Sequence, residues 1–225
     1  MAVDQANRPA RPAGHYEAPP RSSRLLGGGT YGNDLLTSAT GAVLIGLLAV
    51  IGVTILRMRP LISVHLFVGM LLLGPIALKL ASTGYRFVRY YTGDPAYRRK
   101  GPPAAGLRAI APIVVLSTVV VMASGVALLL AGPSWRDTLL PIHKVSFIVW
   151  VGFTGLHVLA HLRSLPPALR ADYGPSRELS GDVTGRAGRV IALSGSLVAG
   201  VVIAIVSIPQ FAAWTQWAAL FHGHH

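Results

Sequence analysis

The chain has 225 residues, of which 52% are hydrophobic, a mean hydropathy of +0.54 and a formal net charge of +12 at pH 7. This composition is too apolar for an ordinary soluble domain and is typical of a protein that crosses a membrane several times. The absence of cysteine excludes disulfides, iron–sulfur clusters and thiolate metal sites.

The basic residues do not indicate a nucleic-acid-binding protein. They lie almost wholly between apolar runs, and no basic helix or aromatic platform stands apart from those runs. In such positions Lys and Arg residues set the topology of a membrane protein and meet anionic lipid. We therefore expect the lipid bilayer, and no nucleic acid, as a partner.

Residues 1–35 are rich in Pro, Arg, Gly and Ala and predict a disordered tail. Five apolar runs follow and predict an all-α integral membrane bundle of five transmembrane helices, in one domain from residue 36 to residue 210. The expected spans are Thr37–Leu56, Leu61–Thr83, Ala109–Ala131, Pro141–Leu165 and Ala187–Ile208. The first four are predicted to form the central four-helix core, with the fifth packed at its side.

Prolines and turn residues punctuate these spans. Pro166-Pro167 and Pro209 are expected to end the fourth and fifth spans, because proline interrupts helical hydrogen bonding. Asp94-Pro95 is expected to open a short helix within the connector Gly84–Arg108, whose tyrosines and arginines suit a headgroup interface. Ser134–Leu140 is expected to form a loop.

The C-terminal residues 211–225 predict an extracytoplasmic interfacial tail, because two tryptophans stand at interface spacing. The tail ends in three histidines, His222, His224 and His225. Flexible histidine tails bind metal ions without biological purpose, so we assign these three no function.

The distribution of basic residues predicts the orientation. The N-terminal tail has four, the connector after the second span six and the connector after the fourth span five. The opposite side has four, namely Arg57, Arg59, Arg136 and Lys144. The positive-inside rule thus predicts a multi-pass protein of the cell membrane with a cytoplasmic N-terminus and an extracytoplasmic C-terminus.

Two spans carry ionisable side chains at the same spacing. Lys79 follows His65 by fourteen residues in the second span, and His157 follows His143 by fourteen in the fourth. Fourteen residues bring a side chain back to nearly the same helix face, roughly 21 Å further along the axis. The two spans run parallel, so we expect His65 to face His143 at one depth and Lys79 to face His157 at another. Ionisable groups inside spans indicate a functional site.

Two imidazoles on facing helices suit the two axial positions of a haem b. Cysteine is absent, so such a haem is expected to be held non-covalently. Ser63, Ser146 and Thr154 are candidate hydrogen-bond partners for the second ring nitrogens. Gly69 leaves room for a porphyrin edge, and Lys144 and Arg136 are placed to meet propionates.

The run HKVSFIVWVGFTGLHVLAHL resembles the last haem-binding helix of small, multi-span bacterial membrane cytochromes b, and the wider resemblance covers about residues 36–210. It implies one or two b haems, ligation by His65, His143 and His157, and electron exchange with a quinone or a redox partner. The chain would then be an electron-transfer protein or a membrane subunit of an oxidoreductase. Lys79 stands where a two-haem member has histidine.

Several alternatives stay open. If a single haem is bound, His157 can replace His143 as the partner of His65. We expect Lys79 to snorkel to the inner headgroups, although it can also ligate as a neutral amine or meet a propionate. His161 is expected to be an ordinary polar residue near the inner surface, although it can bind a metal ion together with His157.

Two other functions compete with electron transfer. A metal-ion-handling membrane protein would need acidic co-ligands, and none is expected inside the five spans. A cofactor-free membrane anchor subunit would leave the histidines unexplained. No nucleophile–base pair or phosphate loop supports a self-contained reaction, and no motif determines the oligomeric state.

Overall fold

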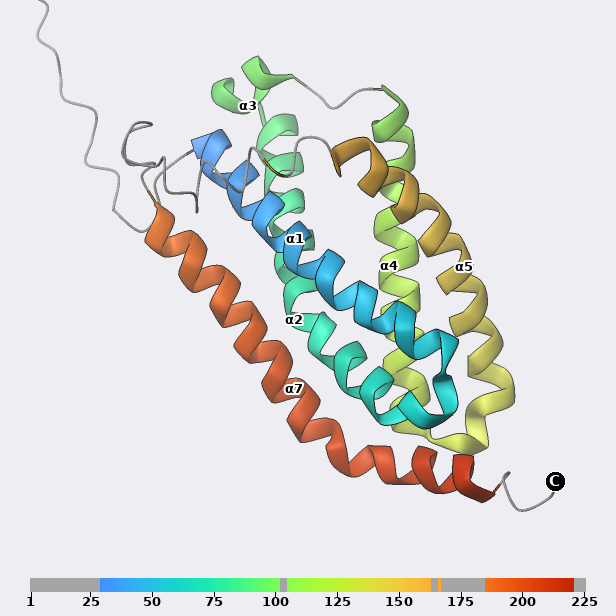
Figure 1. Cartoon of the computed structure of the whole chain (residues 1–225). Helices are drawn as coiled ribbons and strands as arrows, with labels where there is room; N and C mark the ends of the chain where they lie inside the picture. The colour runs from blue at the N-terminus through green and yellow to red at the C-terminus, as the bar shows by residue number, and fades with distance from the viewer. Residues whose placement is uncertain (1–28, 102–104, 163–165, 167–184, 221–225) are drawn as a thin grey trace, which may run out of the picture.

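The computed structural model describes residues 29–101, 105–162, 166 and 185–220, and this part of the chain is helical without a strand. Five long helices dominate it, and a short helix and a 3-10 turn lie in the connections (Figure 1). In chain order they are α1 (Gly29–Leu56), α2 (Met58–Tyr91), α3 (Pro95–Lys100), α4 (Ala105–Ala131), η1 (Pro133–Trp135), α5 (Arg136–His161) and α7 (Arg186–Leu220).

Each of the five long helices has the length and composition to cross a membrane. About twenty apolar residues cover the hydrocarbon thickness of a bilayer, and each of these helices has at least 26 residues. The predicted all-α, five-helix membrane architecture is therefore confirmed. Connections alternate between two ends of the bundle, which we name the α3 end and the η1 end after the elements that lie there (Figure 1).

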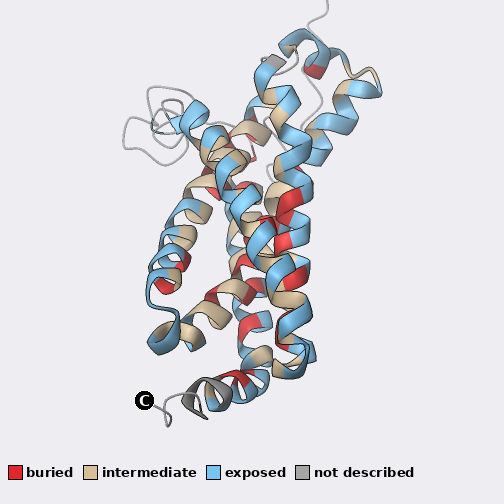
Figure 2. Cartoon of the chain, turned by 90° about the vertical axis from the view of Figure 1, so that its right-hand side faces the viewer, coloured by how far each residue is buried: buried red, intermediate tan, exposed pale blue. Residues whose placement is uncertain are grey.

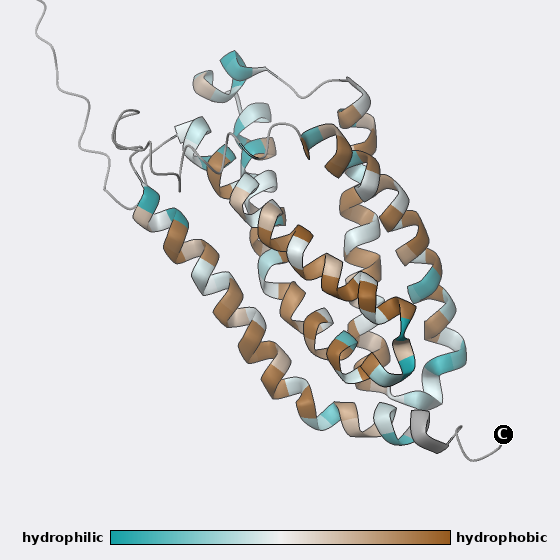
Figure 3. Cartoon of the chain, viewed as in Figure 1, coloured by the Kyte–Doolittle hydropathy of each residue, from teal (hydrophilic) through white to brown (hydrophobic). Residues whose placement is uncertain are grey.

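The outward faces of the helices are apolar. Large hydrophobic side chains stay exposed along α4, α5 and α7, among them Leu159 at 67% and Val206 at 72%. Figure 2 shows exposed residues over most of the helix surfaces, and Figure 3 shows hydrophobic residues along the same helices. Such an apolar surface fits lipid rather than water.

The helix boundaries differ from the predicted spans at several places. α1 begins at Gly29, so residues 29–35 are helical and do not belong to a disordered tail; residues 1–28 lie outside the described part. α2 continues past Thr83 to Tyr91, because no proline or glycine pair interrupts it before Gly93. The expected loop Ser134–Leu140 is instead η1 followed by the first turns of α5.

Prolines interrupt the helices less than expected. Pro141 lies inside the N-terminal part of α5. α7 runs through Pro209 to Leu220, and Figure 1 shows that it changes direction towards its C-terminal end. A proline removes one main-chain hydrogen bond and commonly kinks a helix, but neighbouring helices can keep the helix continuous. Pro209 therefore bends the fifth span and does not end it, and α5 ends at His161, before Pro166.

The helices pack as two groups. α2 packs extensively against α1 and α7, and α4 packs extensively against α5. Smaller contacts of α4 with α2 and α7 join the groups. The fifth span is thus a principal partner of α2, where the sequence predicted a helix at the side of a four-helix core.

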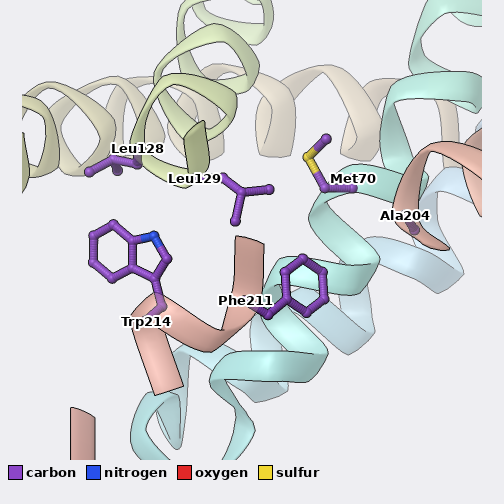
Figure 4. Packing of buried hydrophobic residues seen from close by; sticks show 6 residues of the cluster. All are labelled: Met70, Leu128, Leu129, Ala204, Phe211 and Trp214. Carbon is purple, nitrogen blue, oxygen red and sulfur yellow. The ribbon is translucent and has the colours of Figure 1, made fainter. Parts of the chain in front are cut away.

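The two groups meet most fully at the η1 end. Six buried residues from α2, α4 and α7 form a cluster there, shown in Figure 4. They are Met70, Leu128, Leu129, Ala204, Phe211 and Trp214. Phe211 and Trp214 were expected in an interfacial tail, yet each is only 7% exposed. The bend of α7 brings them into contact with residues of α4, so they belong to the packed bundle. Their expected position at the membrane interface stays a prediction, and residues 221–225 lie outside the described part.

α2 and α7 approach each other where both have glycine. A Cβ at Gly200 would overlap the main-chain carbonyl oxygen of Leu71, and a Cβ at Gly74 would overlap that of Ser196. Close backbone approach through small residues is a principal source of helix association in membranes, where lipid removes the hydrophobic drive. This contact holds the fifth span against the second.

A network at the α3 end holds α3 against the helices. Asp94 caps α3 by accepting hydrogen bonds from the main-chain amides of Ala96 and Tyr97, at 2.9 and 3.2 Å. The predicted short helix after Asp94 is thus confirmed. Tyr97 is buried and packs edge-on against Tyr85 of α2, with ring centroids 6.1 Å apart.

Asp34 of α1 adds a second restraint at this end. Its carboxylate pairs with Arg86 of α2 at 3.5 Å and with Lys100 of α3. One acidic residue therefore ties the beginning of α1 to the end of α2 and to the short connecting helix.

Replacing Gly200 by alanine is expected to destabilise the protein by about 1–3 kcal/mol, because the added methyl group forces α7 away from Leu71. Unfolding in mixed micelles with increasing sodium dodecyl sulfate measures the loss. Gly195→Ala is the matched control, since nothing lies within 4 Å of its Cβ position, and it should leave stability equal or slightly higher. Equal effects of the two substitutions would contradict the close contact.

Protection of the α3 amides is expected to depend on Asp94 ionisation. The amide hydrogen bond from Tyr97 is the largest cause that lowers the pKa of Asp94, and the amide of Ala96 and the charge of Arg89 act in the same direction. A lowered folded-state pKa means that the stabilisation is present above the unfolded value near 4 and is lost as the pH falls through the folded value.

Hydrogen exchange measures this effect as protection factors of the Ala96 and Tyr97 amides between pH 3 and pH 7. The wild-type factors should fall at low pH. Asp94→Asn retains an acceptor without a titrating charge and should give factors independent of pH; a fall of the same size in that variant would rule out Asp94 as the cause.

Candidate functional site

His65 lies two turns into α2 near the η1 end, and its ring orientation is defined by α1. Its Nδ1 lies 2.9 Å from the hydroxyl oxygen of Thr54, which itself donates to the carbonyl of Ile51 at 2.6 Å. A hydroxyl has one hydrogen, so Thr54 accepts from His65 and Nδ1 carries the proton. The Nε2 atom of His65 therefore holds a free lone pair.

His143 lies two turns into α5 and is oriented in the same way by α4. Its Nδ1 lies 3.1 Å from the carbonyl oxygen of Val121 and 3.0 Å from the hydroxyl of Ser124. A carbonyl only accepts, so Nδ1 donates and Nε2 again holds the lone pair. A Cβ on Gly125 would come within 3.1 Å of the ring, so glycine allows the imidazole to lie against α4.

His65 and His143 lie at one level of the bundle, near enough for a positive charge on one ring to act on the other. Within the described residues neither Nε2 has a hydrogen-bond partner. Two imidazoles near each other thus present unused lone pairs, while their other nitrogens are held by neighbouring helices. This is the arrangement expected of paired metal ligands.

The neighbouring helix that hydrogen-bonds to each imidazole differs from the prediction. The second and fourth spans were expected to face each other, but α2 packs on α1 and α7 whereas α5 packs on α4. Ser146 donates to the carbonyl of His143 in its own helix, at 3.0 Å, and does not contact either ring. The partners are Thr54 and Val121 with Ser124, which sequence reasoning missed because no local spacing links them to the histidines.

Lys79 lies further along α2, towards the α3 end, and reaches sideways to α1. Its ammonium group donates to the main-chain carbonyl of Thr37 at 2.6 Å, against the open backbone at Gly41. Thr37 is the residue at which the first span was predicted to begin, so the expectation that Lys79 snorkels to the headgroups stays a prediction. Its charge interacts with His157 and His161.

The level of Lys79 and His157 differs chemically from that of His65 and His143. Nδ1 of His157 and the hydroxyl of Thr154, one turn earlier on α5, are both buried, and neither has a hydrogen-bond partner within the part of the chain that the structure describes. His161 is exposed, with its ring centroid 4.8 Å from that of His157. Between the levels, the indole of Trp150 donates to the hydroxyl of Thr118 at 2.9 Å and ties α5 to α4.

Charged residues occupy the ends of the helices. Lys144 is exposed beside His143, and Arg136 pairs with Asp137 at 3.1 Å. Asp34 and Asp137 lie inside α1 and α5, where no acidic residue was expected, because both helices begin earlier than predicted. Among the described residues, no group of three or more His, Asp or Glu side chains can hold a metal ion.

Two grooves lie elsewhere on the surface. One of about 550 Å³ lies between α2 and α7 and is lined by Ser63, Phe67 and Phe211, among others. The other, of about 330 Å³, lies between α4 and α5 and includes Ser117 and Ser146. Neither includes a histidine, and both open to the apolar surface. His222, His224 and His225 lie outside the described residues.

In the cofactor-free protein, His65 and His143 are both expected to be Nδ1–H tautomers. Nitrogen-15 chemical shifts of labelled histidines measure this directly. Thr54→Val removes the acceptor of His65, worth about 1 kcal/mol, and should shift the signals of His65 alone towards a mixture of tautomers. Thr40→Val is the control, because Thr40 is equally buried and donates only to Leu36. Identical spectra for both variants would contradict the assignment.

Comparison of the chain with models of protein families, with curated proteins and with solved structures finds no match. The chemistry of the site therefore has to be argued from its residues.

Proposed function

We propose that this protein is a membrane cytochrome of the b type, which holds one non-covalent haem between Nε2 of His65 and Nε2 of His143 and transfers electrons in the bilayer. The proposal rests on one observation, namely that the two imidazoles have the same tautomer and the same pattern of hydrogen bonding. Each Nδ1–H is bound by a neighbouring helix, and each Nε2 lone pair is unused. Axial haem ligands need this orientation.

The ligand inventory supports haem over a bare metal ion. Two imidazoles provide too few protein ligands for a closed ion site, and the described residues contain no group of three. A porphyrin supplies the remaining four nitrogens itself. Nothing lies within 4 Å of the Cβ position of Gly69, one turn after His65, which leaves space for the edge of a flat ring.

The haem would supply reversible one-electron chemistry, while the chain's own residues set its environment. His65 and His143 would hold the iron through their Nε2 atoms, and Thr54 and Val121 keep their rings from rotating. Lys144, exposed beside His143, is placed to pair with propionates. The apolar helices exclude water, and a quinone or a redox partner protein would exchange electrons with the site. By the positive-inside rule, we place the α3 end in the cytoplasm and the protein in the cell membrane.

The second level supports a single haem in place of two. His157 has no histidine opposite it on α2, where Lys79 donates to α1. Its Nδ1 also lacks the hydrogen bond that orients His65 and His143. His157 thus lacks both the partner and the support of an axial ligand. A cofactor-free anchor would leave the two oriented imidazoles without a role.

A reduced-minus-oxidised visible spectrum tests the proposal, together with haem quantification as the pyridine complex. We expect a b-type α band and one haem per chain. His65→Ala and His143→Ala should each abolish the band, because one axial bond is lost. His157→Ala and His161→Ala, the matched controls on α5, should retain it. No band in the wild type, or a band that survives both His65→Ala and His143→Ala, would refute the proposal.

A further inference from the structure

Lys79 is a cation inside the bundle for which the described residues provide no counterion. Its ammonium group has three hydrogens, and the carbonyl of Thr37 accepts one of them. No carboxylate of the described residues lies within 4 Å of it. Asp34, one turn before Thr37 on α1, is already paired with Arg86 and Lys100.

The surroundings of Lys79 add further basic groups. Its positive charge lies near enough to act on the rings of His157 and His161 of α5, and the charge of Arg86 also acts on His161. A cation within a membrane span is costly unless a partner of opposite charge balances it. The local excess of basic groups therefore favours a ligand that brings negative charge.

Two buried polar atoms on α5 have no hydrogen-bond partner among the described residues. They are the hydroxyl of Thr154 and Nδ1 of His157, which stand one turn apart. A buried polar atom without a partner costs about 1–3 kcal/mol. Two such atoms beside an uncompensated ammonium group indicate a ligand with several acceptor oxygens.

We infer that the bundle binds an anionic oxygen group, a carboxylate or a phosphate, between Lys79 on α2 and Thr154 with His157 on α5. The ammonium group of Lys79 supplies the charge, and the hydroxyl of Thr154 and the imidazole of His157 donate to the same group. The group belongs to an amphiphile of the membrane. This level lies roughly 21 Å along α2 from His65, which is beyond the reach of a propionate of the proposed haem.

Titration with decanoate and decyl phosphate tests the site, and decanol is the uncharged probe of equal chain length. The measurements are the thermal midpoint of haem-free protein in a non-ionic detergent and the nitrogen-15 shifts of His157. The two anions should raise the midpoint saturably and shift the His157 signals, whereas decanol should do neither. Equal responses to decanol would show that the chain length alone causes binding and would overturn the inference.

Lys79→Met removes the charge and keeps the length of the side chain. It should weaken decanoate binding at least about tenfold, since an ion pair in a low dielectric is lost. Arg59→Met, at an exposed basic residue of the η1 end, is the control and should bind as the wild type does. Thr154→Val keeps every charge and should weaken binding several-fold, which covers the case in which Lys79→Met does not fold. Unchanged binding in both Lys79→Met and Thr154→Val would overturn the inference.

Haem-loaded protein should bind decanoate as the haem-free form does, because the site lies one level away from His65 and His143. Loss of decanoate binding on haem loading would overturn the inference. Should the wild type take up no haem at all, the proposed function fails, yet the haem-free titration still decides whether the anion site exists.

Discussion

The structure depends on how polar side chains inside apolar helices find hydrogen-bond partners on adjacent helices. In lipid no water replaces a missing partner. Hydroxyl groups such as those of Thr40 and Ser146 donate to carbonyls of their own helix, whereas two of the imidazoles and the ammonium group of Lys79 turn towards a neighbouring helix. His65 donates to Thr54 of α1, His143 donates to Val121 of α4, and Lys79 donates to Thr37 of α1. These bonds set which nitrogen of each histidine remains available for a ligand.

The same constraint separates two levels that look alike in the sequence. At the level of His65 and His143, the rings are anchored at Nδ1 and offer Nε2, which suits coordination of iron. At the level of Lys79 and His157, the cation is anchored and the opposing polar atoms of Thr154 and His157 are not. That suits an acceptor ligand. One repeated spacing of fourteen residues thus produces two levels with different hydrogen bonding, because the neighbouring helices differ.

The number and class of the helices could be predicted from apolar run length alone, since a bilayer demands about twenty apolar residues for each crossing. The residues at which the helices begin and end could not be predicted in this way. Pro209 was expected to end α7, but packing against α2 and α4 keeps the helix continuous and buries Trp214. Asp34 was assigned to a tail, but its pairs with Arg86 and Lys100 place it in a helix.

The sequence by itself determined five membrane helices, the short helix after Asp94, and two pairs of basic side chains at matched depths, because these follow from composition and from helical periodicity. Tertiary structure alone decided that α5 leans on α4, that α7 packs on α2 through Gly74 and Gly200, and that Thr54 and Val121 hold the imidazoles. The reason is physical: a periodic pattern in the sequence defines one face of one helix. Which helix packs on that face depends on how closely the two backbones can approach, and this distance is set jointly by glycines on both helices.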